Sequence, residues 1–350
     1  MKKVKLGEVA TFINGYAFKP QDWSTEGKEI IRIQNLTKTS KEINYYSGKI
    51  DKKYIVETGD ILISWSGTLG VFQWYGKTAV LNQHIFKAVF DKLDINKSYF
   101  KYVVEKGLQD AVKNTHGSTM KHLTKKYFDN IIVSYRSLKE QQKISRKLDL
   151  LCELISMRQE QLEELNLLVK SRFNEMFGDP ISNSLKLPIK KFEKVVTLQR
   201  GFDLPIQNRQ VGEINVWGSN GIVATHTESK VTEQGIVTGR SGSIGKVYVT
   251  EKEYWPLNTT LFSKELHGNN PIFLKYLLEA FKLERFNNGT GVPTLNRNIV
   301  HKEDIIYVPL ALQNEFADFV AKVDKSQLAI QKSLEELETL KKSLMQEYFG

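Results

Sequence analysis

The chain has 350 residues and a formal net charge of +10, so it is long enough for two domains that each bury a core. Its single cysteine, Cys152, excludes a disulfide framework and a thiolate metal site, as is common in a reducing cytoplasm. No run of about 18 apolar residues occurs, and Glu8 and Asn14 interrupt the region where a signal peptide would be apolar, so we expect a cytoplasmic protein without a membrane partner.

Residues 1–137 predict a mixed α and β domain. Short β-branched and aromatic runs, GDILISW at 59–65 and AVLNQHIFKAVF at 79–90, lie between Gly, Asn and Ser turns, as expected of strands. The stretch SYFKYVVEKGLQDAV at 98–112 predicts a short helix. Lysines of this domain such as Lys106 are expected on solvated faces.

Residues 138–178 predict one long helix. Apolar residues recur with alternating spacings of four and three, which is typical of a coiled-coil seam. About 40 residues at 1.5 Å each form a helix of about 60 Å. Taken alone, the pattern fits a generic dimerisation helix equally well. The apolar positions of this seam are Ile144, Leu148, Leu151, Ile155, Leu162 and Leu165.

Residues 179–311 predict a second mixed domain, reached through the linker FGDPISNSLKLP at 177–188. GIVTGRSGSIGKVYV at 235–249 predicts strands around a glycine-rich turn, and PIFLKYLLEAFKLERF at 271–286 predicts a helix. Residues 312–350 predict a second long helix. The apolar positions of its seam are Phe316, Val320, Val323, Ile330, Leu334 and Leu337.

The chain contains an internal repeat with an offset of 172 residues in the long helices. QLEELNLLVKSRFNEMFG at 161–178 and SLEELETLKKSLMQEYFG at 333–350 match at 10 of 18 positions. Each half therefore combines one mixed domain with one long helix. Three weaker echoes pair SGTLG at 66–70 with SGSIG at 241–245, LNQHIF at 81–86 with LNTTLF at 257–262, and Val9, Thr11 and Gly15 with Val195, Thr197 and Gly201.

Two long helices that continue from equivalent domains and are joined by one short linker cannot pair in parallel. We therefore expect an antiparallel coiled coil with pseudo-twofold symmetry, in which Arg158 of the first seam faces Gln327 of the second. The expected fold class is α+β: two mixed α/β domains in tandem, each followed by a long α-helix, with the two helices packed against each other.

The segment TGRSGSIGKV at 238–247 is similar to a phosphate-binding loop but fails at two points. A P-loop has four residues between its first glycine and the Gly-Lys pair, and a hydroxyl residue after the lysine that binds magnesium. Here five residues separate Gly239 from Gly245, and Val247 follows Lys246. Since the turn occurs in both halves and only one copy carries the lysine, we expect a structural turn without a nucleotide.

The positive charge lies outside the long helices. Segments 138–178 and 312–350 carry net charges of 0 and −2, which leaves +12 on the rest of the chain. Basic domains of this kind are typical of contact with nucleic-acid phosphates. Solvated lysines alone are the simpler explanation of a basic composition.

The order of elements and several short sequences resemble the specificity subunit of type I restriction-modification enzymes. The most family-like are the repeated LEEL helix that ends in Phe-Gly, and GDILIS followed by SGTLG. The start of each long helix resembles the family signature Pro-x-Leu-x-Glu-Gln, with departures: Arg136 stands at the proline of the first copy, and VPLALQNE at 308–315 lacks the Glu-Gln pair. The resemblance covers essentially the whole chain.

The resemblance implies that each mixed domain is a target recognition domain for one half of a split double-stranded DNA sequence. It also implies that the helices form a spacer that binds two modification (methyltransferase) subunits and, through them, the restriction subunits. S-adenosylmethionine, ATP and Mg are then expected only on the partner subunits, and this chain needs no cofactor. The implied domains are 1–137, 138–178, 179–311 and 312–350.

Sequence-specific DNA binding combines phosphate contacts, which position the protein, with base-edge contacts, which specify the sequence. We therefore expect polar and basic side chains on loops, and Arg240 is the strongest candidate for guanine because a guanidinium donates to both guanine acceptors. The candidates in the first domain are Gln34, Asn35, Ser66, Thr68, Gln83, His116, Ser118, Lys121, His122 and Lys125. Those in the second are Arg200, Ser219, Asn220, Arg240, Ser243, Lys246, Thr290, Asn296 and Arg297.

The sequence carries no motif for catalysis. It lacks an Asn-Pro-Pro-Tyr-like motif for adenine methylation, a glycine fingerprint for S-adenosylmethionine and a nuclease carboxylate cluster. His116, His122 and Asp129 lack the spacing of metal ligands. We therefore expect a non-enzymatic DNA-reading scaffold. Two alternatives stay open: a structural coiled-coil protein that binds nucleic acid without sequence specificity, and an enzyme with an unrecognised active site.

Overall fold

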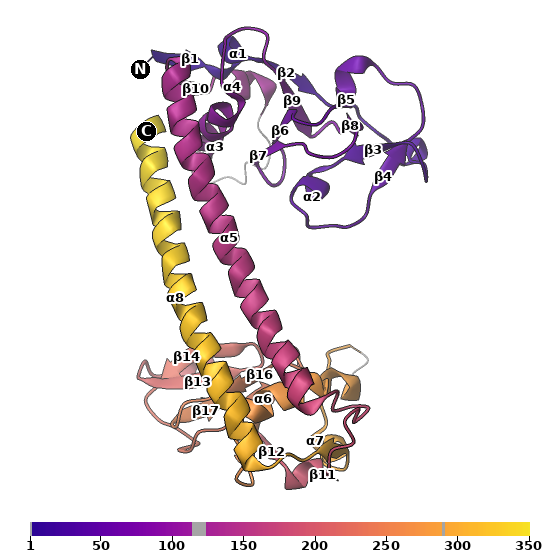
Figure 1. Ribbon diagram of the computed structural model, residues 1–350, viewed down its shortest axis with the longest axis vertical. Helices are drawn as coiled ribbons and strands as arrows, with labels where there is room; N and C mark the ends of the chain where they lie inside the picture. Colours follow the sequence, from indigo (N-terminus) through magenta and orange to yellow (C-terminus); the bar gives the residue numbers. More distant parts are fainter. Residues whose placement is uncertain (1, 114–123, 289–290) are drawn as a thin grey trace. The chain divides into compact units, whose positions relative to one another are not determined.

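The chain divides into two compact units that each contain part of both long helices. The first unit consists of Met1–Met157 with Ser333–Gly350, and the second consists of Arg158–Lys332. We refer to the part of each unit outside the two long helices as its globular part. The computed structural model describes residues 2–113, 124–288 and 291–350 (Figure 1).

The first globular part contains short helices and strands and leads into the first long helix. Its α-helices are α1 (Leu6–Val9), α2 (Ile33–Leu36), α3 (Lys97–Lys113) and α4 (Lys125–Asp129), followed by the long helix α5 (Leu138–Phe177). Its strands are β1 (Lys2–Lys5), β2 (Thr11–Asn14), β3 (Lys28–Ile31), β4 (Asn44–Tyr46), β5 (Ile55–Val56), β6 (Ile61–Ser64), β7 (Gly70–Gln73), β8 (Ala79–Leu81), β9 (Ile85–Val89) and β10 (Ile132–Tyr135).

The second globular part has a similar order of elements. Its α-helices are α6 (Pro271–Ala280) and α7 (Arg297–Val300), followed by the long helix α8 (Leu310–Phe349). Its strands are β11 (Ile189–Lys191), β12 (Thr197–Arg200), β13 (Ile214–Gly218), β14 (Gly221–His226), β15 (Ile236–Gly239), β16 (Val247–Val249), β17 (Tyr254–Pro256), β18 (Thr260–Glu265) and β19 (Asp304–Ile306). Short 3₁₀ turns occur at Pro20–Asp22, Lys52–Tyr54, Phe192–Lys194, Ile206–Asn208 and Leu283–Phe286.

Both globular parts contain the same central sheet of four antiparallel strands. The strand order is β2-β9-β6-β7 in the first and β12-β18-β15-β16 in the second. A second sheet, β4-β3-β8-β5 in the first and β14-β13-β17 in the second, includes one parallel pair in each case. The two-stranded pairs β1-β10 and β11-β19 also correspond. The repeat in the sequence is therefore a repeat of topology, and the predicted α+β class is confirmed.

Strand β6 explains why three successive apolar residues, Ile61 to Ile63, stand in the middle of the run GDILISW. Ile61, Leu62 and Ile63 are all fully buried, although successive side chains of a strand point to opposite faces. Ile61 and Ile63 belong to the main core of the first unit, and Leu62 belongs to a smaller core with Ile31. Both faces of the strand are covered, so an alternating pattern would bury polar side chains.

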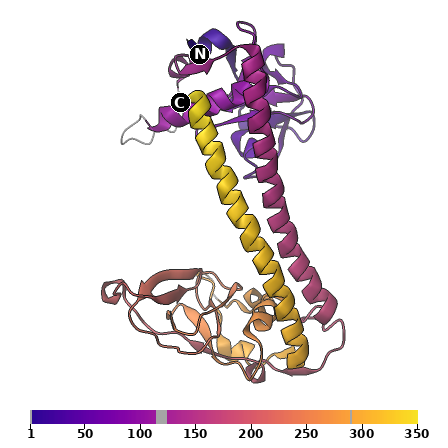
Figure 2. The ribbon, with the colours of Figure 1, turned by 60° about the vertical axis from the view of Figure 1, so that its left-hand side comes forward.

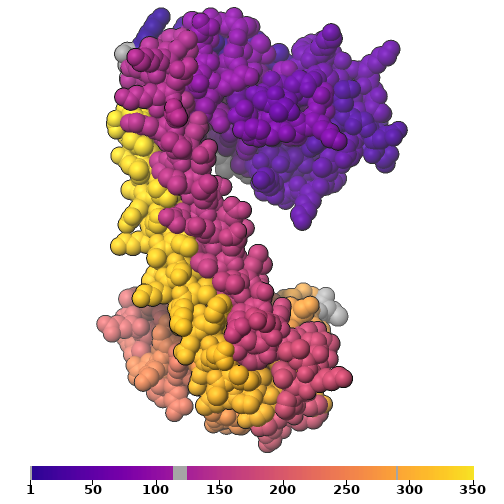
Figure 3. All heavy atoms as spheres, in the orientation of Figure 1, coloured from indigo at the N-terminus to yellow at the C-terminus, as the bar shows by residue number. Residues whose placement is uncertain are grey.

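Helices α5 and α8 lie side by side and run in opposite directions in both units (Figures 1 and 2). In the first unit, Leu148 of α5 shares a buried core with Met345 and Phe349 at the end of α8. The atoms of α5 and α8 lie against each other in the space-filling view (Figure 3). In the second unit, Phe173 of α5 packs on Phe316 at the start of α8, with ring centroids 5.5 Å apart. The predicted antiparallel pairing is therefore confirmed, and the pseudo-twofold relation between the units stays a prediction.

The seam positions predicted from the sequence lie on the covered sides of these helices. Their packing partners include the globular parts as well as the other long helix. The buried positions are Ile144, Leu148, Leu151, Phe316, Val320, Val323 and Leu334, and the partly buried ones are Ile155, Leu162, Leu165, Ile330 and Leu337.

The polar contact predicted in the middle of the seam is wrong. Gln327 Nε2 donates to Asn166 Oδ1 at 3.0 Å, eight positions beyond Arg158 along α5. Arg158 instead donates to Gln161 Oε1 of its own helix at 2.8 Å. The prediction assumed that the twofold axis lies at the centre of the seam. In the structure, aromatic packing at the helix ends restricts the register. A heptad pattern carries no information about that packing.

A buried glutamine connects each globular part to a long helix. Gln141 Oε1 of α5 accepts a hydrogen bond from the backbone N–H of Asn96 at 2.8 Å, just before α3. Gln313 Oε1 of α8 accepts one from the backbone N–H of Asn270 at 2.9 Å, just before α6. The two glutamines are 172 residues apart and are 0% and 1% exposed. The same contact in both units identifies α3 and α6 as equivalent helices.

Two details differ from the sequence expectations. Helix α8 begins at Leu310, two residues before the expected segment 312–350. Lys106 is 9% exposed, so its expected solvated position is wrong: its Nζ lies 2.6 Å from Asp110 Oδ1, one turn further along α3.

No helix in the described part of the chain is long and apolar enough to cross a membrane.

Candidate nucleic-acid interface

The glycine-rich turn of the second unit joins β15 to β16 and is held by two other loops. The backbone N–H of Arg240 donates to the carbonyl of Thr259 at 2.8 Å, and the N–H of Leu295 donates to the carbonyl of Arg240 at 2.8 Å. The N–H of Gly242 donates to the carbonyl of Pro293 at 3.0 Å. These bonds bring three loops together at one end of the central sheet.

Glycine is required at two positions of this turn. A Cβ on Gly239 would lie 1.8 Å from the carbonyl oxygen of Ser243 and 3.2 Å from the Ser219 side chain. Gly242 has a φ of +85°, in the left-handed region that favours glycine. The close approach at Gly239 brings the turn between β13 and β14, which contains Ser219 and Asn220, against the glycine-rich turn. The glycines are thus accounted for by packing and backbone conformation.

Arg240 is the central side chain of this loop cluster. It is partly exposed, and its Nη1 donates to the carbonyl of Asn258 at 3.4 Å. The Asn258 side chain in turn donates to the carboxylate of Asp203. This contact restrains the guanidinium, which has several further N–H donors for an acceptor such as a base edge.

The other described candidates of the second domain lie around the same loops. Arg200 is exposed at the end of β12, and Lys246 is exposed on the glycine-rich turn. Asn296 caps α7 by accepting a hydrogen bond from the N–H of Asn298 at 3.0 Å, and Arg297 follows it. The structure therefore brings together Arg200, Ser219, Asn220, Arg240, Ser243, Lys246, Asn296 and Arg297.

A partly buried histidine supports the strand that ends at Arg200. His301 Nε2 accepts a hydrogen bond from the backbone N–H of Leu198 at 3.0 Å. Burial lowers the pKa of His301, which favours the neutral ring that can accept this bond. His301 thus acts on the interface by positioning β12.

The first unit has the equivalent loop between β6 and β7. Ser64 Oγ donates to the carbonyl of Thr68 at 2.5 Å. The backbone N–H of Trp65 donates to the carbonyl of His84 at 3.4 Å, and its ring Nε1 donates to Asn14 Oδ1 at 3.0 Å. The end of β2, the β6–β7 loop and the turn before β9 therefore meet at the corresponding end of the central sheet.

The first-domain candidates on these loops differ in accessibility. Thr68 is exposed, and Gln83 is partly exposed with its Nε2 3.3 Å from His84 Nε2. Ser66 is only 7% exposed. Thr68 and Gln83 are therefore open to a ligand, whereas Ser66 supports the loop from inside.

The remaining first-domain candidates lie elsewhere. Gln34 and Asn35 belong to α2, where Asn35 Oδ1 accepts from the N–H of Arg32 at 3.1 Å and its Nδ2 donates to the carbonyl of Glu42 at 2.8 Å. Asn35 therefore stabilises its own loop. Lys125 Nζ lies 2.6 Å from Asp129 Oδ2, so an ion pair offsets its charge. His116, Ser118, Lys121, His122 and Thr290 lie outside the described residues.

The sequence prediction missed two side chains of the first interface. Trp65 occupies the place that Arg240 has in the second unit, and Asn14 occupies the place of Arg200. An alignment of the two halves from the echoes SGTLG with SGSIG and Thr11 with Thr197 would have found both. The two interfaces thus have one backbone plan and unlike side chains.

No group of three or more potential metal-ligating side chains occurs within residues 2–113, 124–288 and 291–350.

A family model described as the type I restriction modification DNA specificity domain matches residues 1–167 and 190–340. The chain therefore belongs to the family of type I restriction-modification DNA specificity domains, with two copies of the domain in tandem. This confirms the resemblance predicted from the repeated helix and the glycine-rich turns.

Two named relatives belong to the same class. The chain is 29% identical over 175 residues to the type I restriction enzyme EcoBI specificity subunit of Escherichia coli, a match that covers 49% of this chain and 36% of that protein. It is 28% identical over 127 residues to the MjaVIII specificity subunit of Methanocaldococcus jannaschii, with 36% and 30% covered. These matches span about a third of the length of each relative.

Two solved structures share the fold. The S subunit of a type I restriction-modification system from M. genitalium superposes with a TM-score of 0.62 at 14% identity, over 100% of this chain and 96% of that one. A chain from a structure on complex assembly and conformational transition of the type I R-M system also gives 0.62 at 14% identity, over 99% and 97%. The likeness extends over both halves and the long helices.

Proposed function

We propose that this chain is the specificity subunit of a type I restriction-modification complex and reads a bipartite double-stranded DNA target. One observation carries the proposal: the two globular parts have the same sheet and loop plan but present different side chains at the same end. Arg240 and Arg200 stand in the second unit where Trp65 and Asn14 stand in the first. Each unit then reads one half-site, and the two half-sites have unlike sequences.

The charges and hydrogen-bond donors of the loops fit this role. The globular parts and linker carry the positive charge of the chain, which suits contact with phosphates. Arg240 is restrained at Asn258 and suits guanine, whose two major-groove acceptors match a guanidinium. Lys246 on the same turn suits a phosphate. In the first unit, Thr68 and Gln83 suit hydrogen bonding to base edges.

The long helices set the separation of the half-sites and dock the partners. We propose that two modification (methyltransferase) subunits bind them, with restriction subunits joining through the complex. The chain is then non-catalytic, because methyl transfer, ATP-driven movement and cleavage belong to subunits that hold S-adenosylmethionine, ATP and Mg. Such a complex acts on cellular DNA in the cytoplasm.

Exchange of one globular part tests the proposal. Residues 1–137 are replaced by the corresponding region of a specificity subunit with a known target, and methylated sites are mapped in cells that contain the methyltransferase subunit. The expected result is a new first half-site with an unchanged second one. A simultaneous change of both half-sites contradicts modular reading, and binding without any sequence preference would favour a structural coiled-coil protein instead.

A further inference from the structure

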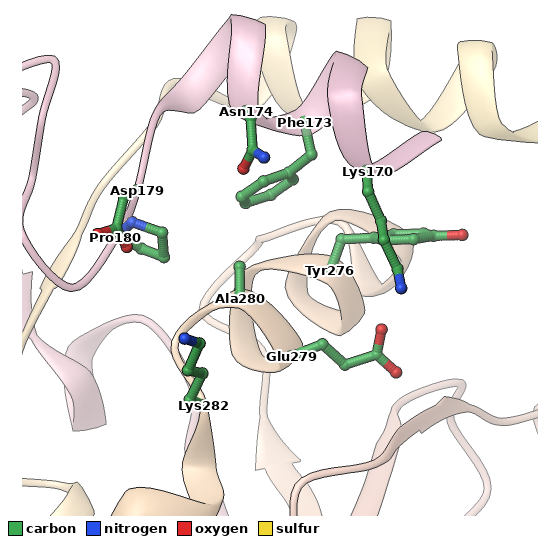
Figure 4. Close-up of a pocket in the computed structure, with 9 residues that line it drawn as sticks. All are labelled: Lys170, Phe173, Asn174, Asp179, Pro180, Tyr276, Glu279, Ala280 and Lys282. Atoms are coloured by element: carbon green, nitrogen blue, oxygen red, sulfur yellow. The ribbon is translucent and has the colours of Figure 1, made fainter. Parts of the chain in front are cut away.

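Each unit contains a hollow where α3 or α6 meets the C-terminal end of a long helix. The hollow of the second unit has a volume of about 420 Å³ (Figure 4). That of the first unit has about 590 Å³. The second is lined chiefly by Lys170, Phe173 and Asn174 of α5 and by Glu279 and Ala280 of α6. The first is lined chiefly by Lys342, Met345 and Gln346 of α8 and by Glu105 and Lys106 of α3.

The two hollows correspond through the internal repeat. The α5 residues that line one and the α8 residues that line the other are related by the offset of 172. Helices α3 and α6 are equivalent because Asn96 and Asn270 make the same bond to Gln141 and Gln313. With this equivalence, each hollow contains an identical lysine, an identical glutamate, an apolar side chain and an amide. The unit was therefore duplicated together with its hollow.

The second hollow combines an apolar floor with charged walls. Phe173, which is 2% exposed, projects from α5 into the hollow, and the ammonium of Lys170 extends past the ring of Tyr276 toward the side of Glu279 (Figure 4). Burial raises the pKa of the Glu279 carboxyl, and the positive charges of Lys275 and, to a smaller extent, Lys170 oppose that rise. Lys170 is exposed and has no ion pair within 4.0 Å in the part of the chain that the structure describes.

The first hollow also combines an apolar floor with a lysine that has no ion pair among the described residues. Met345, which is 6% exposed, forms the floor. Glu105 is paired with Lys341 at 3.8 Å, which leaves the neighbouring Lys342 exposed and without an ion pair to any described residue. Both hollows therefore offer, beside an apolar surface, an exposed ammonium that has no ion pair within 4.0 Å among the described residues.

Internal packing does not explain why both copies keep this lysine. Exposed side chains contribute little to stability, so the stability of the chain alone does not require an exposed lysine at this position. A lysine beside an apolar floor matches a carboxylate that is flanked by an apolar side chain. DNA fits less well, because carboxylates stand beside the lysines in both hollows, so neither is the purely basic surface that phosphates favour. The charged lining residues are Lys170, Lys282, Asp179 and Glu279 in the second hollow and Lys106, Lys341, Lys342, Glu105 and Glu338 in the first.

We propose that the two hollows are paired docking points for two copies of one partner protein. Each copy inserts an apolar side chain against Phe173 or Met345 and pairs a carboxylate with Lys170 or Lys342. The identity of the partner as the methyltransferase subunit rests on the proposed function. Two equivalent hollows on one chain then account for two bound copies of the same partner.

Charge reversal tests the proposal with the full chain and the purified methyltransferase subunit. The number of bound subunits is measured by native mass spectrometry and the affinity by titration, for Lys170→Glu, Lys342→Glu and the double variant. Each single reversal is expected to weaken one site about thirtyfold or more, so that one subunit remains bound, and the double reversal is expected to remove both. Lys170→Met and Lys342→Met keep the side-chain volume and are expected to weaken binding less.

Matched controls separate the hollows from the rest of the helices. Lys143→Glu on α5 and Lys325→Glu on α8 reverse exposed lysines that do not line either hollow, and both are expected to bind two subunits. Circular dichroism checks that every variant is folded. Two bound subunits in the folded double variant would overturn the docking points while leaving the proposed function intact. Loss of DNA affinity or of self-association alone would also overturn them, and a wild-type chain that binds no methyltransferase would overturn both proposals.

Discussion

Replacement of the buried glutamines by alanine tests how the globular parts are attached to the long helices. The Gln313 side chain makes three hydrogen bonds, to the N–H of Asn270 at 2.9 Å, to Asn269 Oδ1 at 2.7 Å and to the carbonyl of Val308 at 2.7 Å. Each buried polar group left without a partner costs about 1–3 kcal/mol. Water that enters the void satisfies part of these groups, so Gln313→Ala is expected to destabilise the second unit by about 3 kcal/mol.

The same substitution in the first unit is expected to cost less. Gln141 makes two side-chain bonds, to the N–H of Asn96 and to the carbonyl of Arg136, both at 2.8 Å. Gln141→Ala is therefore expected to cost about 2 kcal/mol. Gln142→Ala is the matched control, because this neighbouring side chain is exposed and its loss is expected to change stability by less than about 0.5 kcal/mol.

Urea unfolding and amide hydrogen exchange measure these effects. The N–H of Asn270 is expected to exchange about a hundredfold faster in Gln313→Ala, since about 3 kcal/mol corresponds to roughly two powers of ten. The N–H of Asn96 should be unaffected in that variant because it is bonded to Gln141. Equal acceleration of both amides, or a loss below about 0.5 kcal/mol, would refute the idea that each glutamine holds its own unit.

Three further outcomes follow from the interface and the second hollow. Arg240→Ala is expected to weaken specific DNA binding by about 1–3 kcal/mol and to relax one position of the second half-site only, as read from methylation maps; an unchanged motif would contradict its assignment to a base. Gly239→Ala places a Cβ 1.8 Å from the carbonyl oxygen of Ser243, so it is expected to lower the free energy of unfolding in urea by about 1–3 kcal/mol. Gly291→Ala is the control: its Cβ meets no atom within 4 Å, so it should have little effect on stability. Because burial raises the pKa of Glu279 in the folded chain, the charged carboxylate opposes folding at neutral pH. Glu279→Gln is therefore expected to raise the urea midpoint at pH 7, and this gain in stability should vanish below the ordinary pKa of 4.5. A gain in stability that grows as the pH falls would contradict this reasoning.

The sequence predicted the elements whose patterns are local. The 4,3 spacing predicted α5 and α8, because burial of one helix stripe imposes this period. The β-branched and aromatic run around Ile61 to Ile63 predicted a strand. The offset of 172 also predicted that the two halves share one topology. Each of these features depends on residue order more than on distant contacts.

Tertiary packing decided the features that the sequence did not reveal. Side-chain packing along the two helices sets the register that pairs Gln327 with Asn166. The heptad period is the same for every register and therefore cannot predict it. Asn35 was a reasonable DNA candidate as an amide on a loop, but its hydrogen bonds to Arg32 and Glu42 are set by the local chain path. Trp65 was missed because an aromatic residue after an apolar strand normally indicates core.

Base-resolution mapping of N6-methyladenine tests the central claim most directly. DNA is compared from a host that contains the methyltransferase subunit with this chain and from the same host with the methyltransferase alone. We expect a split motif with a fixed unspecified gap that is methylated only when this chain is present. A stable complex of the two proteins that methylates no such motif would contradict the claim that the chain selects a bipartite DNA target.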